Sequence, residues 1–136
     1  MLNCSLYYIY AMEKNYLQLN QITAYTKAFH LSNLIWNLVT NWDSFAKYTI
    51  GQQFVDAVDS ISANIAEGFG RYHKKDKVKF YYYSFGSVKE CLDWNEKAKV
   101  RKLISEETYI KIFATLETLP KEIHQLIKFT NEKLKI

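Results

Sequence analysis

Hydrophobic residues recur every three or four positions along most of this chain, which is the spacing of amphipathic helices. The pattern predicts four helical segments, over about residues 19–39, 44–69, 76–102 and 105–135. No stretch alternates hydrophobic and polar residues as a half-buried strand would, and one proline and four glycines leave few breaks. Because the connections are short, sequential helices should be antiparallel neighbours. We therefore predict an all-α fold, an antiparallel up-down-up-down four-helix bundle.

The second segment has the clearest core stripe and the clearest end. Its hydrophobic residues recur at spacings of three and four: Phe54, Val58, Ile61, Ile65 and Phe69. Gly68 and Gly70 predict the end of the helix, because glycine enters the left-handed C-cap conformation without a Cβ clash. Gly51 lies inside the segment at a cost of about 1 kcal/mol relative to alanine, which predicts close packing or a slight bend there.

Polar residues before the hydrophobic stripes predict where the other helices begin. Asp43 or Ser44 should cap the second segment, Asp76 the third and Ser105 the fourth. The stripe of the fourth segment passes Pro120 in phase, which predicts one helix kinked at the proline rather than two helices.

The first and third segments each carry two adjacent hydrophobic stripes, a wider arc than a bundle helix needs. In the first segment, the stripes are Ile22, Tyr25, Phe29, Trp36 and Val39, and beside them Ala28, Leu31, Ile35 and Leu38. In the third segment, they are Val78, Tyr81, Phe85, Val88 and Leu92, and beside them Phe80, Ser84, Ser87, Cys91, Trp94 and Ala98. Aromatic residues make up 16% of the chain, which is more than a single four-helix core requires. Exposed apolar patches of this size are unusual on a monomer, so we expect a homo-oligomer.

Residues 1–18 precede the first segment, and we expect them to form a poorly ordered extension outside a bundle domain that spans residues 19–136. The sequence after Met12 is more polar, so residues 1–11 could be an upstream start without a structural role. Cys4 and Cys91 form no CxxC pair and no signal peptide is evident, which favours free thiols in the cytoplasm. The longest charge-free run, residues 28–42, is 15 residues long and partly polar, so we expect no membrane association.

Positive charge is concentrated in one segment. Residues 71–102 hold ten Lys/Arg and four Asp/Glu, whereas the rest of the chain holds eight and ten. Lysines bind phosphates with little regard to sequence, and an exposed aromatic residue of the run from Phe80 to Tyr83 could stack on a base. The alternatives are a solvated cationic turn and contact with another protein. The residues expected to bind nucleic acid are Arg71, His73, Lys74, Lys75, Lys77 and Lys79.

Catalytic and metal-binding signatures are missing from the sequence. It has no P-loop, HExxH or GxSxG, and no helix carries the Glu-x-x-His pair of di-iron bundles. His30, His73 and His124 lie on different segments. The Gly68-x-Gly70 pair follows a helix, whereas phosphate-binding glycines precede one. We expect no catalytic residue, no metal and no cofactor.

Two polar residues, Asn64 and Glu67, lie beside the core stripe of the second segment. A buried polar group must find partners or it destabilises the fold. We expect these residues to form a structural polar network with Ser84, Ser87 or a tyrosine of the third segment. The alternative is a functional site.

The stretch from Ser60 to Arg71, Ser-Ile-Ser-Ala-Asn-Ile-Ala-Glu-Gly-Phe-Gly-Arg, resembles the signature of a four-helix-bundle family, the ribosomal-RNA intervening-sequence proteins. That family includes the accessory variability determinant of diversity-generating retroelements. The resemblance continues through the Lys74-Lys75-Asp76 turn, the aromatic helix and Gly86-Ser87, and it is specific over residues 50–102.

This resemblance implies an antiparallel four-helix protomer, a ring-shaped homopentamer and a basic surface associated with nucleic acid. No catalytic residues come with the family. In the retroelement branch the ring is similar to a platform for a reverse transcriptase and its RNA, so a reverse transcriptase is among the implied partners.

Residues and resemblance together favour a non-enzymatic oligomeric adaptor or scaffold that associates with RNA or DNA through a basic turn and helix. The alternative is a protein-only scaffold whose basic segment binds an acidic protein partner. Gene context and the salt dependence of RNA binding would distinguish the two.

Overall fold

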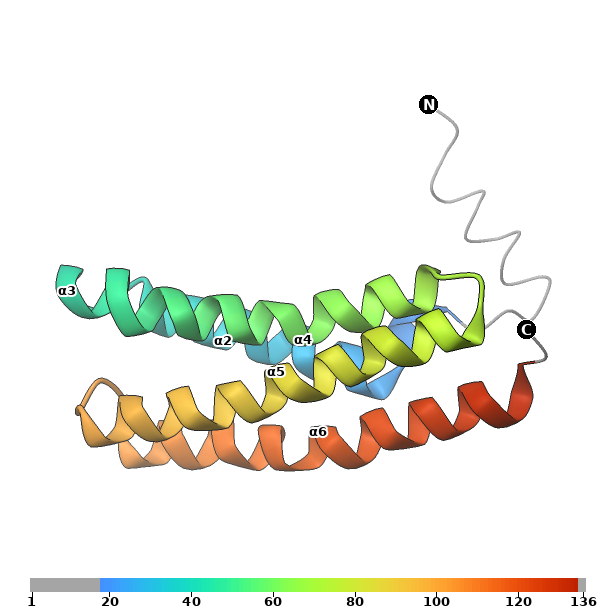
Figure 1. The fold of residues 1–136 in the computed structure, drawn as a ribbon. Coiled ribbons are helices and arrows are strands. Elements are labelled where there is room, and N and C mark those ends of the chain that lie inside the picture. Colours follow the sequence, from blue (N-terminus) through green and yellow to red (C-terminus); the bar gives the residue numbers. More distant parts are fainter. Residues whose placement is uncertain (1–17, 135–136) are drawn as a thin grey trace.

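Four long helices packed side by side make up the computed structural model, which describes residues 18–134 (Figure 1). Helix α4 contacts α2 and α5 most extensively, α5 also packs against α6, and α2 contacts α6 less closely. No strand occurs in residues 18–134, so the all-helical prediction is confirmed. The predicted extension lies almost wholly outside this range. The elements are η1 (Leu19–Gln21), α2 (Thr23–Val39), α3 (Ser44–Ala46), η2 (Lys47–Gly51), α4 (Gln52–Gly70), α5 (Lys74–Val100) and α6 (Glu106–Lys133).

Helix α4 supplies the most uniformly hydrophobic part of the core. Phe54, Val58, Ile61 and Ile65 are all buried, as their spacing predicts, and Phe69 is half-buried at the edge. Burial of each such side chain stabilises the fold by about 1.5–3 kcal/mol. This stripe therefore anchors the helix that leads into the basic segment.

The two hydrophobic stripes of α2 differ in how deeply they are buried. Leu31 and Ile35 are buried in the core, together with Ala28. In the other stripe, Phe29 and Trp36 are 46% and 55% exposed, whereas Ile22 and Val39 at its two ends are buried. The middle of this stripe therefore lies on the surface of the chain.

Helix α5 buries a stripe that combines both of its predicted stripes and includes polar residues. Its buried members are Tyr81, Ser84, Val88, Cys91, Asn95 and Ala98. The polar members bond to main-chain carbonyls of neighbouring helices: Ser84 Oγ donates to the Ile61 oxygen (2.8 Å) and Asn95 Nδ2 to the Tyr109 oxygen (3.2 Å). These bonds offset part of the cost of burying polar groups, although Asn95 Oδ1 is buried without a hydrogen-bond partner among residues 18–134.

Two of the predicted N-caps are confirmed and one is wrong. Asp43 and Ser105 accept hydrogen bonds from the main-chain N–H groups three residues on, each at 3.1 Å. Helix α5 begins at Lys74 rather than after Asp76, with His73 as its N-cap. Asp76 lies in the first turn, where its carboxylate is favoured by the helix dipole. Helix α6 runs through Pro120 as one helix.

Helix α4 ends at Gly70, but not for the reason that its glycines predict. No glycine in residues 18–134 has a positive φ, and the chain leaves the helix through an extended Arg71 (φ −73°, ψ 149°). Gly68 instead permits close packing, because a Cβ there would lie 2.7 Å from Tyr81 Cε1 and 2.9 Å from the Lys77 oxygen. The left-handed C-cap prediction is therefore wrong.

Gly51 serves the packing role that its position predicts. It is buried at the end of the π-helical turn η2, and a Cβ there would lie 2.7 Å from Val39 Cγ1. Close approach of this turn to α2 therefore requires glycine.

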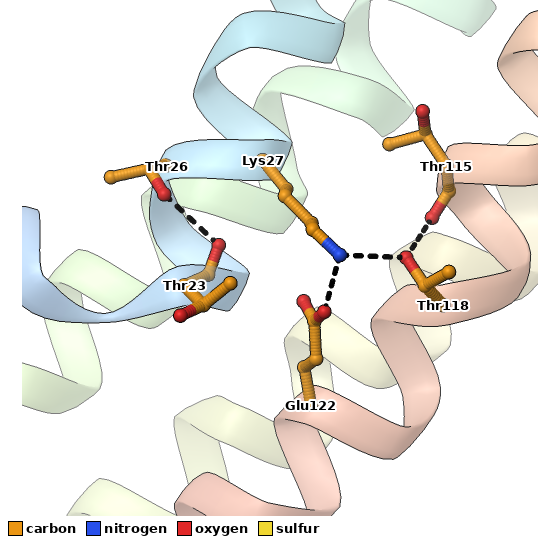
Figure 2. A network of polar contacts seen from close by, with 6 residues as sticks. All are labelled: Thr23, Thr26, Lys27, Thr115, Thr118 and Glu122. Carbon is orange, nitrogen blue, oxygen red and sulfur yellow. Dashed lines mark hydrogen bonds and ion pairs between the residues drawn. The ribbon is translucent and has the colours of Figure 1, made fainter.

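A polar network joins α2 to α6 (Figure 2). Lys27 Nζ lies 2.5 Å from Glu122 Oε1 and 3.4 Å from Thr118 Oγ1, which in turn donates to the Thr115 oxygen at 2.8 Å. A partly exposed ion pair of this kind stabilises a fold by about 1 kcal/mol or less. The network therefore helps to close the bundle without dominating its stability.

Candidate nucleic-acid interface

The six predicted binding residues all lie in the connection between α4 and α5 or in the first turns of α5. Residues 71–73 form the whole connection. Arg71, His73, Lys75 and Lys79 are exposed, whereas Lys74 and Lys77 are half-buried. The fold thus gathers the predicted cations at one end of the bundle.

The carboxyl end of α6 lies beside the first turn of α5. Lys74 Nζ is 3.4 Å from the Leu134 oxygen, which brings the last turn of α6 and its exposed Lys133 to this turn. We call the surface formed by Arg71, Lys74, Lys75, Lys79 and Lys133 the basic end.

Aromatic rings hold two of the cations in place. The guanidinium carbon of Arg71 lies 4.6 Å from the centroid of the Phe80 ring, and Lys79 Nζ lies 5.6 Å from the same centroid. Lys79 Nζ is also 5.9 Å from the centroid of Tyr83. Arg71 bonds in addition to Glu67 at 2.7 Å, so one acid partly offsets its charge. The rings orient these cations without removing them from solvent.

Lys77 has a different role from the other lysines. Its ammonium donates to the Phe69 oxygen at 2.6 Å and lies 3.5 Å from the Gly68 oxygen, at the carboxyl end of α4. Burial lowers the pKa of Lys77 below its ordinary value. Because this cation satisfies the orphan carbonyls that end a helix, we exclude Lys77 from the residues offered to a ligand.

Exposed tyrosines accompany the basic end. Tyr72, in the connection, is 72% exposed, and Tyr82 and Tyr83 of α5 are 53% and 51% exposed. Their neighbour Tyr81 points into the core and is 2% exposed. The prediction that at least one aromatic residue of the run from 80 to 83 is exposed is confirmed. Tyr72 is exposed because it lies in the connection between the helices. Helical spacing says nothing about such a position, so Tyr72 is not among the predicted residues.

Asn64 and Glu67 bond locally. Asn64 Nδ2 donates to the Ser60 oxygen at 2.8 Å, and Glu67 pairs with Arg71. These residues lie at the edge of α4, where partners on the same segment and solvent suffice. The polar bond between α4 and α5 is made by Ser84 instead, which donates to a main-chain carbonyl.

Residues 18–134 also bear on three other functions: metal binding, thiol reactivity and membrane insertion. This range contains no group of three or more metal-ligating side chains. The Cys91 thiol is buried, and burial raises its pKa, which disfavours the reactive thiolate. Cys4 lies outside the range. None of the helices described combines the length and the apolar character that a membrane crossing requires.

An open hollow of about 360 Å³ lies between α2 and α4. Tyr25 and Phe29 line it from α2, and Asp59, Ser62 and Ala63 line it from α4. Burial and the neighbouring Asp56 raise the pKa of Asp59. No basic residue lines this hollow.

Comparisons with known proteins identify relatives of this chain in sequence and in fold. A family model described as "23S rRNA-intervening sequence protein" matches residues 20–125. A crystal structure of a protein with unknown function from the S23 ribosomal protein family of Bacteroides thetaiotaomicron aligns with a TM-score of 0.72 and 20% identity. The alignment covers 78% of this chain and 99% of that one, and it shows a shared fold. Comparison with curated proteins gave no match.

Proposed function

Because the chain belongs to the family of 23S rRNA-intervening sequence proteins, we propose that it is a non-enzymatic oligomeric adaptor that binds RNA or DNA through the basic end. The observation that carries the proposal is the gathering of Arg71, Lys74, Lys75, Lys79 and Lys133 at one end of the bundle, beside the exposed Tyr72. Clustered cations bind a polyanion by releasing its counterions, with little dependence on sequence.

The distribution of charge between the two halves of the structure supports a directional polyanionic partner. Residues 18–70 hold two Lys/Arg and four Asp/Glu, whereas residues 71–134 hold fourteen and nine. The net charges are therefore −2 and +5. Such a separation steers an anionic ligand toward the α5–α6 half and away from the α2–α4 half.

We infer that the helices alternate in direction, as the sequence predicts. As α5 advances from Tyr81 to Ser84, its contacts on α4 go back from Gly68 to Ile61. The contacts of α5 with α6 run the same way, first Phe85 with His124 and then Asn95 with Tyr109. This order is what would place the end of α6 beside the connection between α4 and α5.

We further propose that the chain forms a homo-oligomer. Phe29 and Trp36 expose large apolar areas along α2, next to the hollow between α2 and α4. The number five rests on the family resemblance alone. A ring would repeat the basic end on each copy, so weak contacts would add up to useful avidity. Light scattering at micromolar concentration tests this point, and a monomeric mass would contradict it.

A double charge reversal tests the nucleic-acid proposal. Lys75→Glu together with Lys79→Glu should abolish binding of an RNA oligonucleotide, because both lysines are exposed and neither forms an ion pair within residues 18–134. Binding by the parent should weaken steeply between about 50 and 200 mM salt. Fluorescence anisotropy at both salt concentrations measures the two effects, and circular dichroism checks that helicity is kept.

The matched control reverses two exposed lysines of α6 that lie away from the basic end. Lys111→Glu with Lys121→Glu changes the net charge by the same amount, so it separates local contact from overall charge. We expect this control to retain most of the RNA affinity. Equal loss in both double variants, or no RNA binding by the parent at low salt, would favour the protein-only scaffold that binds an acidic protein.

A further inference from the structure

Gly86 occupies a position where this chain has no internal need for glycine. It lies in the middle of α5, is exposed, and has an ordinary helical φ. A Cβ added there would meet nothing within 4 Å. Glycine in a helix interior weakens the helix relative to alanine, so its presence at an open site calls for a cause outside the protomer.

The neighbours of Gly86 on the same face of α5 are aromatic and basic. Tyr82 and Tyr83 precede it by one turn and are both about half exposed. Lys79 lies one turn before them, and Lys89 lies one turn after Gly86 with its ammonium 5.4 Å from the Phe85 ring centroid. We call the face formed by Lys79, Tyr82, Tyr83, Gly86 and Lys89 the glycine face.

We propose that the glycine face binds single-stranded nucleic acid, with bases stacked on Tyr82 and Tyr83 and the strand passing close over Gly86. This inference rests on the proposed function and adds a substrate class to it. Base stacking needs exposed rings and unpaired bases, which a duplex keeps in its own stack. The missing side chain at Gly86 leaves the helix backbone open to close approach by a ligand.

Charge and position favour a nucleic acid over a protein helix on this surface. The glycine face continues from the basic end, since Lys75 and Lys79 lie on the same side of α5 as Gly86. From Lys75 to Lys89 the helix rises by about 21 Å, which is room for several nucleotides. The cationic surface stops at Glu90, which accepts a bond from Trp94 Nε1 (3.2 Å).

Gly86→Ala tests the inference because its two expected effects have opposite directions. The melting temperature should rise, since alanine favours the helix and meets no neighbour. Affinity for a 12-nucleotide single-stranded RNA should fall. Tyr83→Leu, which keeps helix propensity but removes the ring, should lower that affinity about 5- to 150-fold. Phe113→Leu, an exposed aromatic residue of α6, is the matched control and should change it little.

Three ligands separate failure of this inference from failure of the proposed function. The parent should bind the single strand more tightly than a duplex of equal length. Inorganic polyphosphate, which has no bases, should bind through the lysines with similar affinity in the parent and in Gly86→Ala. Failure of the parent to bind any of the three at low salt would overturn both proposals.

Either of two results would contradict the glycine-face proposal and leave the proposed function standing. One is equal binding of single strand and duplex by the parent. The other is unchanged single-strand affinity in Gly86→Ala. If that variant also lowered the mass measured by light scattering, the face would be a contact between protein subunits instead.

Discussion

Gly68 and Gly86 are both helical glycines with ordinary φ, yet their surroundings are opposite. A Cβ at Gly68 would lie 2.7 Å from the Tyr81 ring, whereas a Cβ at Gly86 would meet nothing. The first glycine is explained by packing between α4 and α5. The second is explained by nothing within the protomer. An internal contact thus explains Gly68, and under the glycine-face proposal an external contact would explain Gly86.

Tyrosines show the same division. Tyr81 lies in the core beside Gly68, and Tyr82 and Tyr83 lie outside beside Gly86. Substitutions on the inner side should change stability, and substitutions on the outer side should change binding. The three experiments below test the inner side of this comparison, from the largest expected effect to the smallest.

The largest effect is expected in the buried hydrophobic stripe of α4. Ile61→Ala and Ile65→Ala should each lower the free energy of unfolding by about 2–5 kcal/mol, because each leaves a cavity at a fully buried position. Urea denaturation of the two variants measures the change. Tyr82→Leu serves as the outer-face control and should stay within about 0.5 kcal/mol of the parent. Unchanged stability of both isoleucine variants would show that the inner face is assigned wrongly.

A smaller loss is expected when Gly68 gains a side chain. Gly68→Ala should destabilise the fold by about 1–3 kcal/mol, since its Cβ would overlap the Tyr81 ring and the Lys77 carbonyl. Gly70→Ala is the matched control two residues on, where a Cβ meets nothing. Thermal melts should place the control at or above the parent. If Gly68→Ala melted like Gly70→Ala, close packing would not explain this glycine.

The smallest effect concerns alkaline pH. Burial raises the pKa of Tyr81 from an ordinary value of 10.0 to about 12, against a weaker opposing effect of the Thr130 side chain. The folded state therefore keeps this proton while the unfolded state loses it, and stability should fall as pH rises from 10 to 12. The loss should reach about 1.4 kcal/mol by pH 11.

Urea titrations at pH 8 and pH 11 measure that slope. Tyr81→Phe should be less stable than the parent at pH 8. Its free energy of unfolding should fall by less than that of the parent between pH 8 and pH 11. Tyr82→Phe is the exposed control and should keep the parent's slope. A parent-like slope in Tyr81→Phe would mean that another group causes the alkaline loss.

Sequence patterns predicted the parts of the fold that depend on hydrophobic spacing alone. Four of the five residues predicted for the α4 stripe are buried, because regularly spaced apolar side chains suffice to place them. In α5, Ser84 lies on a predicted stripe but the buried Asn95 lies on neither stripe, and both side chains bond to main-chain carbonyls, those of Ile61 and Tyr109. Those partners are set by how the helices meet, which the pattern of one helix does not contain.

The candidate site was likewise predicted in position but not in detail. The cationic turn lies where the charge pattern places it, whereas the role of Lys77 depends on the carbonyls that end α4. Lys133 is 59 residues from Lys74 in sequence, and only the folded bundle brings its turn to the basic end. Long-range packing therefore decides which cations belong to the surface.

The three-residue connection between α4 and α5 has a consequence for how quickly a ligand could be captured. Many basic nucleic-acid-binding segments are tails that fold as they bind, and ordering them costs part of the interaction energy. Here Lys77 clamps the start of α5 to the end of α4, so the neighbouring cations are already in place. If this end binds nucleic acid as proposed, association would need no folding step at these cations, and electrostatic encounter would set its rate.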